Sequence, residues 1–305
     1  MKVLVTGAGG FIGRYLVPAL LAKRHSVVAT DLSVPEHAGS SEQLVWRRLD
    51  VSRADSVYKL MLSERPDAAV HLVSWLAGPC EADPLRGWEI NFWSTHYLLD
   101  AGVAAGLDRF VFSSSIAVFG KGLPEPVRDD AVKEPVTIYG QTKLACEHLM
   151  RWYKSKHGIE AVAVRFPWVY GPGRETGITA MYSSKLLDAL ARNEPLHITS
   201  PDEKGDWLYV KDAVKALLLV LECKTNSQVG YNIMSGLYSI REAMEVARKV
   251  CPEAVISYAG DAAQSDNPYP LSYDDSPARR DLGWSPDYSL EAGFREHISI
   301  MRKAG

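Results

Sequence analysis

The chain has 305 residues, 47% of them hydrophobic and 23% charged, so it is long enough to bury a large core in one domain or two closely associated ones. Its net charge of −3, from 34 basic and 37 acidic residues, argues against a nucleic-acid partner and against binding to an anionic membrane. No apolar run is long enough to span a bilayer, so no membrane partner is expected.

Four cysteines lie far apart in the sequence and include no Cys-x-x-Cys pair: Cys80, Cys146, Cys223 and Cys251. We therefore expect no metal site and no disulfide framework, but reduced thiols in a cytoplasmic protein. The apolar N-terminus is interrupted by glycines and by Arg14, a pattern typical of a strand and a turn rather than a signal peptide.

A glycine-rich turn lies between two short apolar runs, residues 3–5 and 27–29, which are typical of strands buried on both faces. Apolar residues at helical spacing follow the glycines, so a helix begins where the turn ends. The three glycines recur at a spacing of three: Gly7, Gly10 and Gly13. A helix start presents N–H groups and partial positive charge to a pyrophosphate, although the glycines alone are also compatible with a plain tight turn.

Asp31 stands at the end of the second apolar run. A carboxylate at this position can accept hydrogen bonds from both hydroxyls of an adenosine ribose and would repel a 2′-phosphate. The next residue is Leu32 rather than arginine. The order of strand, glycine turn, helix, strand and acid therefore predicts a site for NAD in preference to NADP.

Strands and helices alternate through the first half of the chain. We expect strands at residues 44–49, 67–73, 109–113 and 161–166, and helices at residues 54–62, 84–105 and 138–157. This alternation predicts an α/β fold, a doubly wound parallel sheet with right-handed crossovers. Residues 74–83 are expected to form a loop at the C-terminal edge of the sheet, where such folds bind ligands.

One acid and one histidine can each have a structural role instead of a functional one. Asp50 can bind an adenine amino group while Val51 packs against the adenine ring. Alternatively, Asp50 or Ser52 can cap the following helix, and the sequence does not decide between these two roles. His71 lies inside an apolar run, which favours a packed core histidine over a catalytic base.

Beyond residue 167 the expected elements become shorter and the loops longer. We expect helices at residues 179–192, at 240–250 and from 290, and strands at 196–198 and 255–258. Residues 207–210 should lead into a further helix that ends at 221, and residues 231–234 form another segment. Residues 1–167 are therefore assigned to a NAD-binding domain. Residues 168–305 are assigned mainly to a smaller, substrate-binding C-terminal lobe that is interleaved with the sheet.

Tyr139 and Lys143 lie one helical turn apart on one face of a predicted helix. A nearby lysine and a positive nicotinamide ring favour the phenolate, so Tyr139 can take a proton from a substrate hydroxyl while Lys143 holds the nicotinamide ribose. Ser115 ends the preceding strand and can hydrogen-bond the same oxygen. The pair alone is a weak signal, but it opens the helix that follows a strand ending in serine.

These motifs together resemble the extended short-chain dehydrogenase/reductases, the group of NAD-dependent sugar epimerases and dehydratases. The resemblance covers nearly the whole chain and is carried by residues 6–13, 71–74, 112–120, 139–143, 165–173, 207–213 and 282–286.

The resemblance implies a Rossmann domain, NAD as the cofactor and the catalytic residues Ser115, Tyr139 and Lys143. Cofactor contacts are expected from Gly7, Gly10, Phe11, Ile12, Gly13, Asp31, Asp50, Val51, Leu72, Val73, Ser74, Tyr139, Lys143, Phe166, Trp168 and Val169. Substrate contacts are expected from Trp75, Ser115, Thr179 and Trp207.

The chain departs from the sugar-nucleotide members of that group at two positions. Gly205-Asp206 replaces an Arg-Asp pair, and residues 266–271 replace an Arg-x-Gly-Asp stretch, so two cations that would bind a diphosphate are missing. Residues 114–120 and 270–279 instead resemble the short-chain-type L-threonine dehydrogenases. Their Gly-Thr-Thr-Asp-Tyr substrate stretch is altered here at residues 177–182.

The sequence therefore predicts a hydride-transferring dehydrogenase for a small polar alcohol, such as a sugar, sugar acid or hydroxy amino acid. A NAD-dependent sugar-nucleotide epimerase and a non-catalytic NAD-sensing regulator are the alternatives. The helices at 84–105 and 138–157 also carry large aromatics, which predict a homodimer unless they pack under the second lobe. These residues are Trp88, Trp93, Tyr97, Trp152 and Tyr153.

Overall fold

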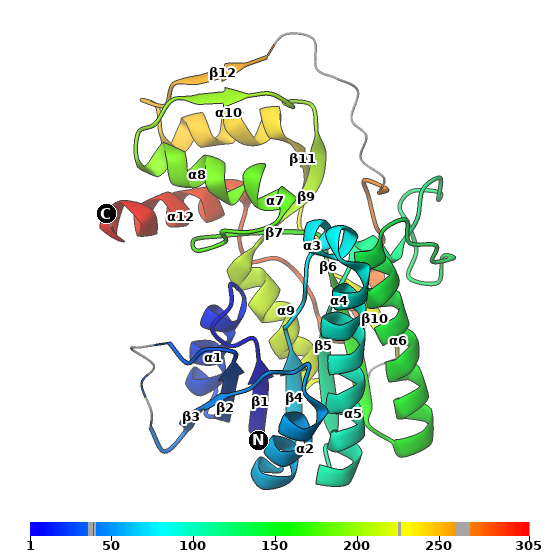
Figure 1. Ribbon diagram of the computed structural model, residues 1–305. Coiled ribbons are helices and arrows are strands. Elements are labelled where there is room, and N and C mark those ends of the chain that lie inside the picture. Colours follow the sequence, from blue (N-terminus) through cyan, green and yellow to red (C-terminus); the bar gives the residue numbers. More distant parts are fainter. Residues whose placement is uncertain (36–38, 40, 225–226, 260–268, 305) are drawn as a thin grey trace.

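Seven parallel strands form the central sheet of the computed structural model, in the order β10-β6-β5-β4-β1-β2-β3. They are β1 (Lys2–Thr6), β2 (Ser26–Asp31), β3 (Leu44–Arg48), β4 (Ala68–His71), β5 (Arg109–Ser115), β6 (Glu160–Phe166) and β10 (Gly230–Asn232). Figure 1 shows a second lobe above the C-terminal edge of this sheet. The structure describes residues 1–35, 39, 41–224, 227–259 and 269–304. The predicted doubly wound α/β fold is confirmed.

Helices cover both faces of the sheet because successive side chains of each strand point to opposite faces. Val3 and Val5 join the core on one face, whereas Leu4 joins the core on the other. The first face is covered by α1 (Gly13–Ala22) and α9 (Val210–Glu222), and the second by α2 (Ala54–Glu64), α5 (Ser94–Ala105) and α6 (Ile138–His157). Strands buried on both sides explain the continuous apolar runs in the sequence.

Residues 74–83, expected to be a loop, contain the helix α3 (Ala77–Ala82). A Cβ atom on Gly87 would lie only 3.0 Å from the Cys80 sulfur, so the two helical segments pack in close contact. Cys80 is fully buried by this packing. Tertiary contact therefore stabilises a helix that a sequence with Gly78 and Pro79 does not favour by itself.

Residues 84–105 are helical but do not form one regular helix. A π-helical turn (Glu89–Trp93) separates α4 (Pro84–Trp88) from α5. The wider turn includes Asn91, which is buried, and its amide donates to the Trp75 carbonyl oxygen at 3.0 Å and to Thr142 Oγ1 at 3.1 Å. The irregular turn thus joins the loop after β4 to α6.

The second lobe contains two small sheets. The order β11-β9-β7 forms one sheet and β12-β8 the other. Its strands are β7 (Trp168–Tyr170), β8 (Leu196–Ile198), β9 (Lys204–Tyr209), β11 (Leu237–Ser239) and β12 (Ile256–Tyr258). The helices beyond the Rossmann sheet are α7 (Ile178–Met181), α8 (Ser184–Ala191), α10 (Ile240–Val250), α11 (Ser276–Leu282) and α12 (Leu290–Ala304).

One predicted helix of this lobe is divided in the structure, and three elements of the lobe are not predicted. The helix expected at 179–192 is divided into α7 and α8, and Ser184 Oγ at the break accepts a hydrogen bond from the Gly171 N–H at 3.2 Å. Neither β7, β11 nor α11 is predicted from the sequence. The two strands have only three residues each, so pairing with β9 rather than a local pattern determines them.

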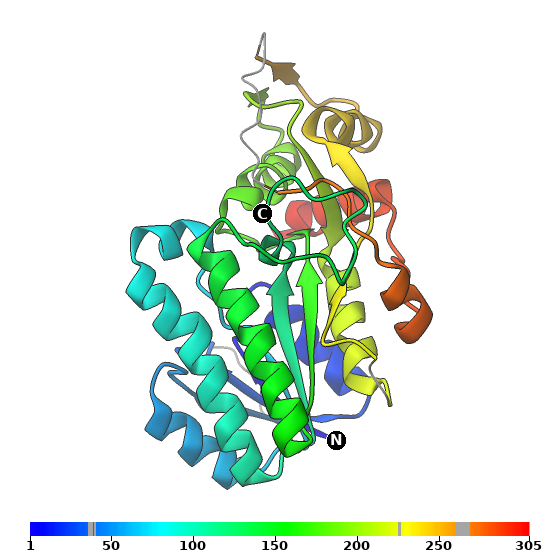
Figure 2. The same cartoon turned by 90° about the vertical axis from the view of Figure 1, so that its right-hand side faces the viewer.

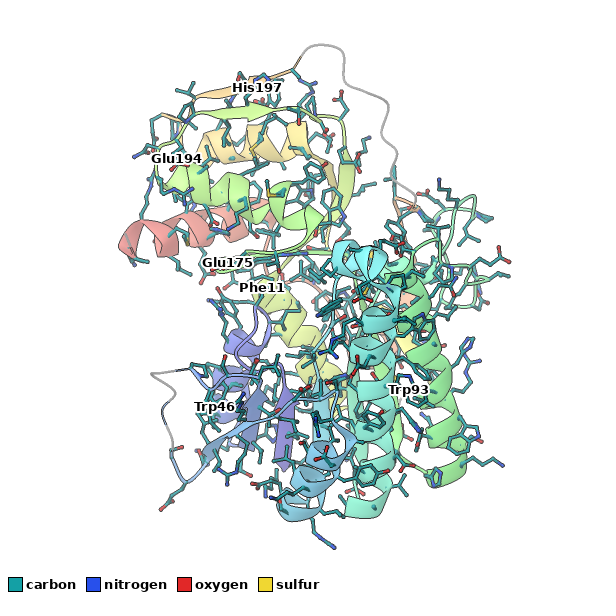
Figure 3. All side chains as sticks on the ribbon, viewed as in Figure 1. Phe11, Trp46, Trp93, Glu175, Glu194 and His197 are labelled. Atoms are coloured by element: carbon teal, nitrogen blue, oxygen red, sulfur yellow. The ribbon has the colours of Figure 1, made fainter. Side chains whose placement is uncertain are left out.

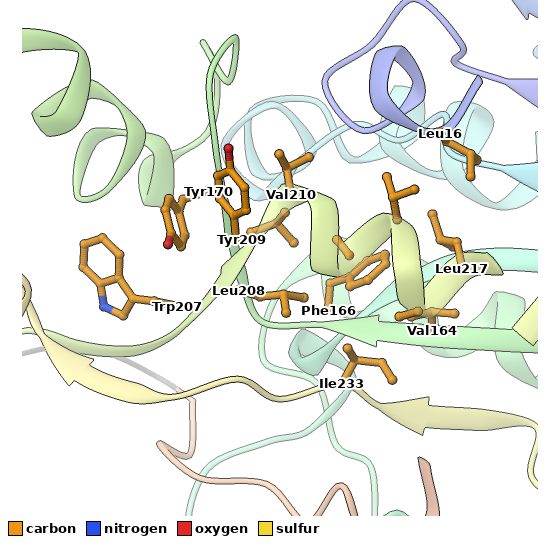
Figure 4. Close-up of a cluster of buried hydrophobic side chains, with 14 of the residues drawn as sticks. Leu16, Val164, Phe166, Tyr170, Trp207, Leu208, Tyr209, Val210, Leu217 and Ile233 are labelled. Carbon is orange, nitrogen blue, oxygen red and sulfur yellow. The ribbon is translucent and has the colours of Figure 1, made fainter. Parts of the chain in front are cut away.

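The chain returns to the central sheet after entering the second lobe. β10 pairs with β6, and α9 packs against the sheet although both follow residue 167. Figure 4 shows side chains of β6, β9 and α9 in one cluster that passes from the sheet into the lobe, including Phe166, Leu208 and Leu217. The two parts therefore share a core.

Figure 2 shows α5 and α6 as two long helices at the front left. Aromatic side chains are exposed on the face formed by these helices and the π-helical turn before α5. Trp93 and Trp152 are 45% and 50% exposed. Tyr153, expected to belong to the same surface, is instead buried and donates to Asp100 Oδ1 at 2.9 Å. Among the described residues, none of the helices combines the length and apolar character needed to cross a membrane.

Candidate active site

A cavity of about 480 Å³ lies at the C-terminal ends of β1, β4, β5 and β6. Figure 3 labels Phe11 of the glycine turn and Glu175 of the second lobe, which both line it. The cavity brings together most of the predicted cofactor residues: Gly7, Gly10, Phe11, Ile12, Gly13, Asp31, Leu72, Val73, Ser74, Tyr139, Lys143, Phe166 and Val169. Ser115 lines it too, whereas Asp50, Val51 and Trp168 do not.

The glycine turn closes tightly between β1 and α1. Gly7 has φ +71°, a conformation that glycine adopts without strain. A Cβ atom on Gly13 would lie 2.3 Å from the Gly7 carbonyl oxygen, so a side chain cannot be accommodated there. No side chain caps the start of α1. The glycines therefore bring a helix start with its backbone N–H groups to the cavity wall.

Asp31 lies at the end of β2, as predicted, and faces this turn. Its Oδ2 accepts a hydrogen bond from the Gly9 N–H at 3.0 Å, and its Oδ1 accepts from the Leu32 N–H at 2.8 Å. The carboxylate is thus held in place at one end of the cavity while keeping acceptor capacity on both oxygens.

Asp50 and Val51 follow the C-terminal end of β3 and do not line the cavity. Asp50 Oδ1 accepts from the N–H and the hydroxyl of Ser52, at 3.0 and 2.7 Å. The alternative that Asp50 or Ser52 caps α2 is wrong, because Arg53 occupies the N-cap position and no side chain caps that helix. Val51 is buried in the core beneath α2 and α5.

The start of α6 brings Tyr139 to the end of β5. Thr137 caps the helix, since its Oγ1 accepts from the Gly140 N–H at 3.1 Å. A Cβ atom on Gly140 would lie 2.2 Å from the Ala117 carbonyl oxygen, so only glycine permits this approach. Ser115 and Tyr139 consequently share a wall of the cavity, and the Ser115 hydroxyl lowers the pKa of the Tyr139 phenol.

Lys143 is buried one turn further along α6. Its Nζ donates to the Ser113 carbonyl oxygen at 2.6 Å and lies 4.5 Å from the centre of the Phe112 ring. Burial lowers the pKa of this ammonium to about 8. Lys143 therefore does not lie on an exposed turn of α6.

The electrostatic effect expected of Lys143 on Tyr139 is not found. Burial raises the pKa of Tyr139 to about 12, and the groups that act in the opposite direction are the Ser115 hydroxyl and the positive charge of Arg174. Lys143 Nζ lies 5.5 Å from the Tyr139 ring centre but points to a backbone carbonyl. The sequence pattern identified Tyr139 and Lys143, but not Arg174, the cation that lowers the pKa of the Tyr139 phenol.

His71 is a core residue, as predicted. It is fully buried between β1 and the helical segment that follows β4, where Nδ1 contacts Thr6 Oγ1 at 2.6 Å and Nε2 contacts Ser94 Oγ at 3.1 Å. Burial lowers the pKa of His71 to about 3 and keeps the imidazole neutral.

The expected substrate contacts are dispersed. Trp207 is only 2% exposed and packs against Tyr170 and Phe294 in the core of the lobe, so it does not line the cavity. Trp75 is tied to Asn91 through its backbone N–H at 2.7 Å and is also absent from the cavity wall. Thr179 contacts the site indirectly, because its hydroxyl accepts from Arg174 Nη2 at 2.5 Å.

Arg174 is a cavity residue that the sequence analysis did not identify. It follows the Gly171-Pro172-Gly173 loop directly, and its guanidinium carbon lies 5.9 Å from the centre of the Phe11 ring. Its position after a loop at the C-terminal edge of the sheet was the available signal. Whether such a residue points inward depends on the packing of the second lobe, which has no local sequence pattern.

Gly205 lies beneath the ring of Trp168. A Cβ atom on this glycine would lie 2.4 Å from Cδ2 of the indole. Trp168 therefore occupies the space into which a side chain at position 205 would extend, and it stacks on Tyr182 on its other side. Of residues 266–271, where the second missing cation was placed, residues 266–268 lie outside the described part of the chain.

Comparison with known proteins identifies one family. The model of the NAD dependent epimerase/dehydratase family matches residues 3–234. A curated relative, an uncharacterized epimerase/dehydratase of Staphylococcus aureus strain USA300, is 28% identical over 301 residues, covering 95% of this chain and 93% of the relative.

Solved structures of two enzyme types are similar in fold. L-threonine dehydrogenase from Phytophthora infestans has a TM-score of 0.88 at 28% identity, with all of both chains covered. UDP-glucose 4-epimerase from Thermotoga maritima also has a TM-score of 0.88, at 23% identity, covering 100% of this chain and 99% of the epimerase.

Proposed function

The chain belongs to the NAD-dependent epimerase/dehydratase family, and on that premise we propose that it is a dehydrogenase that oxidises a small polar alcohol. The observation that carries the proposal is the cavity itself, which joins a glycine turn and an acid at one end to a serine, a tyrosine and a lysine at the other. NAD, when bound, accepts the hydride from the alcohol carbon. The chain must position the alcohol and remove its proton.

The residues of the cavity fit NAD. The tight turn at Gly7 and Gly13 leaves no side chain between the helix start and a pyrophosphate. Asp31 retains acceptor capacity for a ribose diol at the end of β2. Lys143, with one proton engaged by the Ser113 carbonyl, has further donors for the nicotinamide ribose. We assign the remaining wall residues predicted from the sequence to the same cofactor.

Tyr139 is the proposed general base. Tyr139 is half-buried and lines the cavity beside Ser115, so both hydroxyls can bind one substrate oxygen. Its pKa of about 12 without bound ligand means that the phenolate needs positive charge nearby. Arg174 supplies part of that charge from the cavity wall.

The packing at Gly205 favours a dehydrogenase over a sugar-nucleotide epimerase. The resemblance implies that such epimerases use an arginine at this position for the diphosphate, and here the Trp168 indole fills the space. Diphosphates favour bidentate cationic partners, so the absence of this one supports a smaller substrate. The likeness to L-threonine dehydrogenases at 28% identity points in the same direction.

The test is NADH formation with a panel of sugars, sugar acids, hydroxy acids and hydroxy amino acids. We expect net NADH with a member of this panel, whereas an epimerase would convert a nucleotide sugar without net NADH. Tyr139→Phe removes one oxygen and should lower kcat by roughly a hundredfold or more while NAD affinity is retained. Ser115→Ala should lower kcat less, because the serine orients the substrate. Near-normal turnover of Tyr139→Phe would overturn the mechanism.

A further inference from the structure

Arg174 lines the cavity, and its guanidinium has a donor that makes no hydrogen bond to the described residues. Nη2 donates to Thr179, but Nη1 is shielded from solvent and has no hydrogen-bond partner within the described residues. Buried guanidinium groups are normally paired, because an unpaired buried charge is costly. An orphaned donor of this kind at a cavity wall indicates that the structure is prepared for an anionic ligand.

The charge of Arg174 is not neutralised by a neighbouring acid. Within the described ranges of the chain, no carboxylate lies within ion-pair distance of it. Burial lowers the pKa of Arg174 to about 10, and the group that acts in the opposite direction is the Tyr139 hydroxyl rather than an aspartate or glutamate. The adjacent Glu175 also lines the cavity, but it forms no ion pair with Arg174 among the described residues and is not one of the groups that shift the pKa of Arg174.

Arg174 lines the same cavity as Ser115 and Tyr139, and its positive charge lowers the pKa of the Tyr139 phenol. Thr179, which accepts a hydrogen bond from its Nη2, belongs to the second lobe. Arg14, in the first turn of α1, also lines the cavity, and a Cβ atom on Gly173 would lie 2.5 Å from its Nη1.

We propose that Arg174 binds a carboxylate of the substrate, so that the enzyme oxidises a hydroxyl on a sugar acid, hydroxy acid or hydroxy amino acid rather than a neutral alcohol. This inference rests on the proposed function. One planar guanidinium matches one carboxylate in a bidentate manner. Binding the carboxylate also fixes the distance between the anionic group and the hydroxyl that Tyr139 deprotonates.

The first experiment compares matched pairs of alcohols with and without a carboxylate. D-glucuronate is paired with D-glucose, L-threonine with L-threoninamide, and D-3-hydroxybutyrate with its amide, and kcat/KM is measured from NADH formation. We expect at least one acid to react, with kcat/KM for its partner that lacks the carboxylate roughly thirtyfold or more lower. A partner without the carboxylate that reacts as well as its acid would overturn the inference.

The second experiment changes the arginine. Arg174→Met should raise KM for the acid by roughly thirtyfold or more. The kcat/KM values for the two members of a pair should then become similar. Arg174→Lys keeps the charge without the planar fork and should be intermediate. Arg192→Met is the matched control, because Arg192 is an exposed residue of the same lobe paired with Glu194, and it should behave as wild type.

Binding measurements separate this inference from the proposed function. The three acids are titrated by calorimetry into protein saturated with NADH, and NAD affinity is measured beside them. Arg174-dependent binding of an acid without NADH formation from any alcohol would refute the dehydrogenase and leave only the carboxylate site at Arg174 standing. The inference falls if none of the acids binds. The inference also falls if Arg174→Met lowers the affinity for NAD as much as the affinity for the acid, since the arginine would then bind the phosphates of the cofactor.

Discussion

Arg174 and Tyr139 line the same cavity, and each shifts the pKa of the other: the guanidinium lowers that of the phenol, and the phenol raises that of the guanidinium. The two come from different parts of the chain, the start of α6 and the loop after β7. Arg174 therefore acts on the proposed base as well as on the proposed carboxylate.

The coupling predicts a shift in the pH profile. Alcohol oxidation requires the Tyr139 phenolate, so kcat should rise with pH as the phenol loses its proton. Removing a nearby cation raises the pKa of an acid, so Arg174→Met should move this rise to higher pH, and Arg174→Lys should move it less. The measurement is kcat at saturating substrate across pH, with Arg192→Met as the control. An unchanged profile in Arg174→Met would refute the coupling.

Lys143→Ala should damage both turnover and cofactor affinity, because the ammonium is proposed to hold the nicotinamide ribose. It also leaves the half-buried Ser113 carbonyl without its donor, which should lower the free energy of unfolding by about 1–3 kcal/mol. Kinetics, NAD titration and denaturant unfolding are the measurements. Lys133→Ala, which removes another half-buried lysine bonded to backbone carbonyls, is the control for the cofactor effect. Unchanged NAD affinity in Lys143→Ala would contradict the assignment.

Asp31 should make the enzyme prefer NAD to NADP. A 2′-phosphate beside this carboxylate brings like charges together, so kcat/KM should favour NAD by roughly a hundredfold. Asp31→Ser removes the charge and should reduce the ratio. The same variant loses the acceptors of the Gly9 and Leu32 N–H groups, so thermal unfolding must be followed in parallel. Equal use of both cofactors by the wild type would refute the assignment.

The face of α5 and α6 is proposed to form a homodimer. Trp93 and Trp152 are large apolar side chains with about half their surface exposed, which is typical of association surfaces. Trp93→Glu or Trp152→Glu should convert the dimer to a monomer by placing a charge in the contact. Val255→Glu, at a 67% exposed position in the second lobe, is the control. The measurement is the mass of each variant by sedimentation at micromolar concentration. A monomeric wild type would refute the homodimer.

Gly205→Ala should destabilise the fold through a single added methyl group. Its Cβ would overlap the Trp168 indole, and such overpacking costs about 1–3 kcal/mol. Gly78→Ala is the matched control, since no atom lies within 4 Å of its Cβ and the site is helical, so the change should be neutral or slightly stabilising. Thermal unfolding compares the two, and equal stability would show that Trp168 moves aside without cost.

Local patterns were sufficient to predict the parts of the site that depend on one strand, one turn or one helix. Helical spacing identified Tyr139 and Lys143, and the ends of parallel strands explain why Ser115 joins them. Arg174 and Trp207 could not be predicted correctly, because burial of a loop arginine or of a core tryptophan depends on how the second lobe folds back. The same reason explains why β10, only three residues long, was not recognised as a strand of the central sheet.

The pairing of β10 with β6 has a consequence for how the chain is made. β6 ends at residue 166, and its neighbour at the edge of the sheet begins at residue 230. While the intervening residues are synthesised, β6 presents an edge of unpaired backbone N–H and C=O groups, of the kind that promotes aggregation. A fragment that ends at residue 167 keeps the whole glycine turn and yet retains this open edge permanently. We therefore expect such a fragment to aggregate more readily than the full chain.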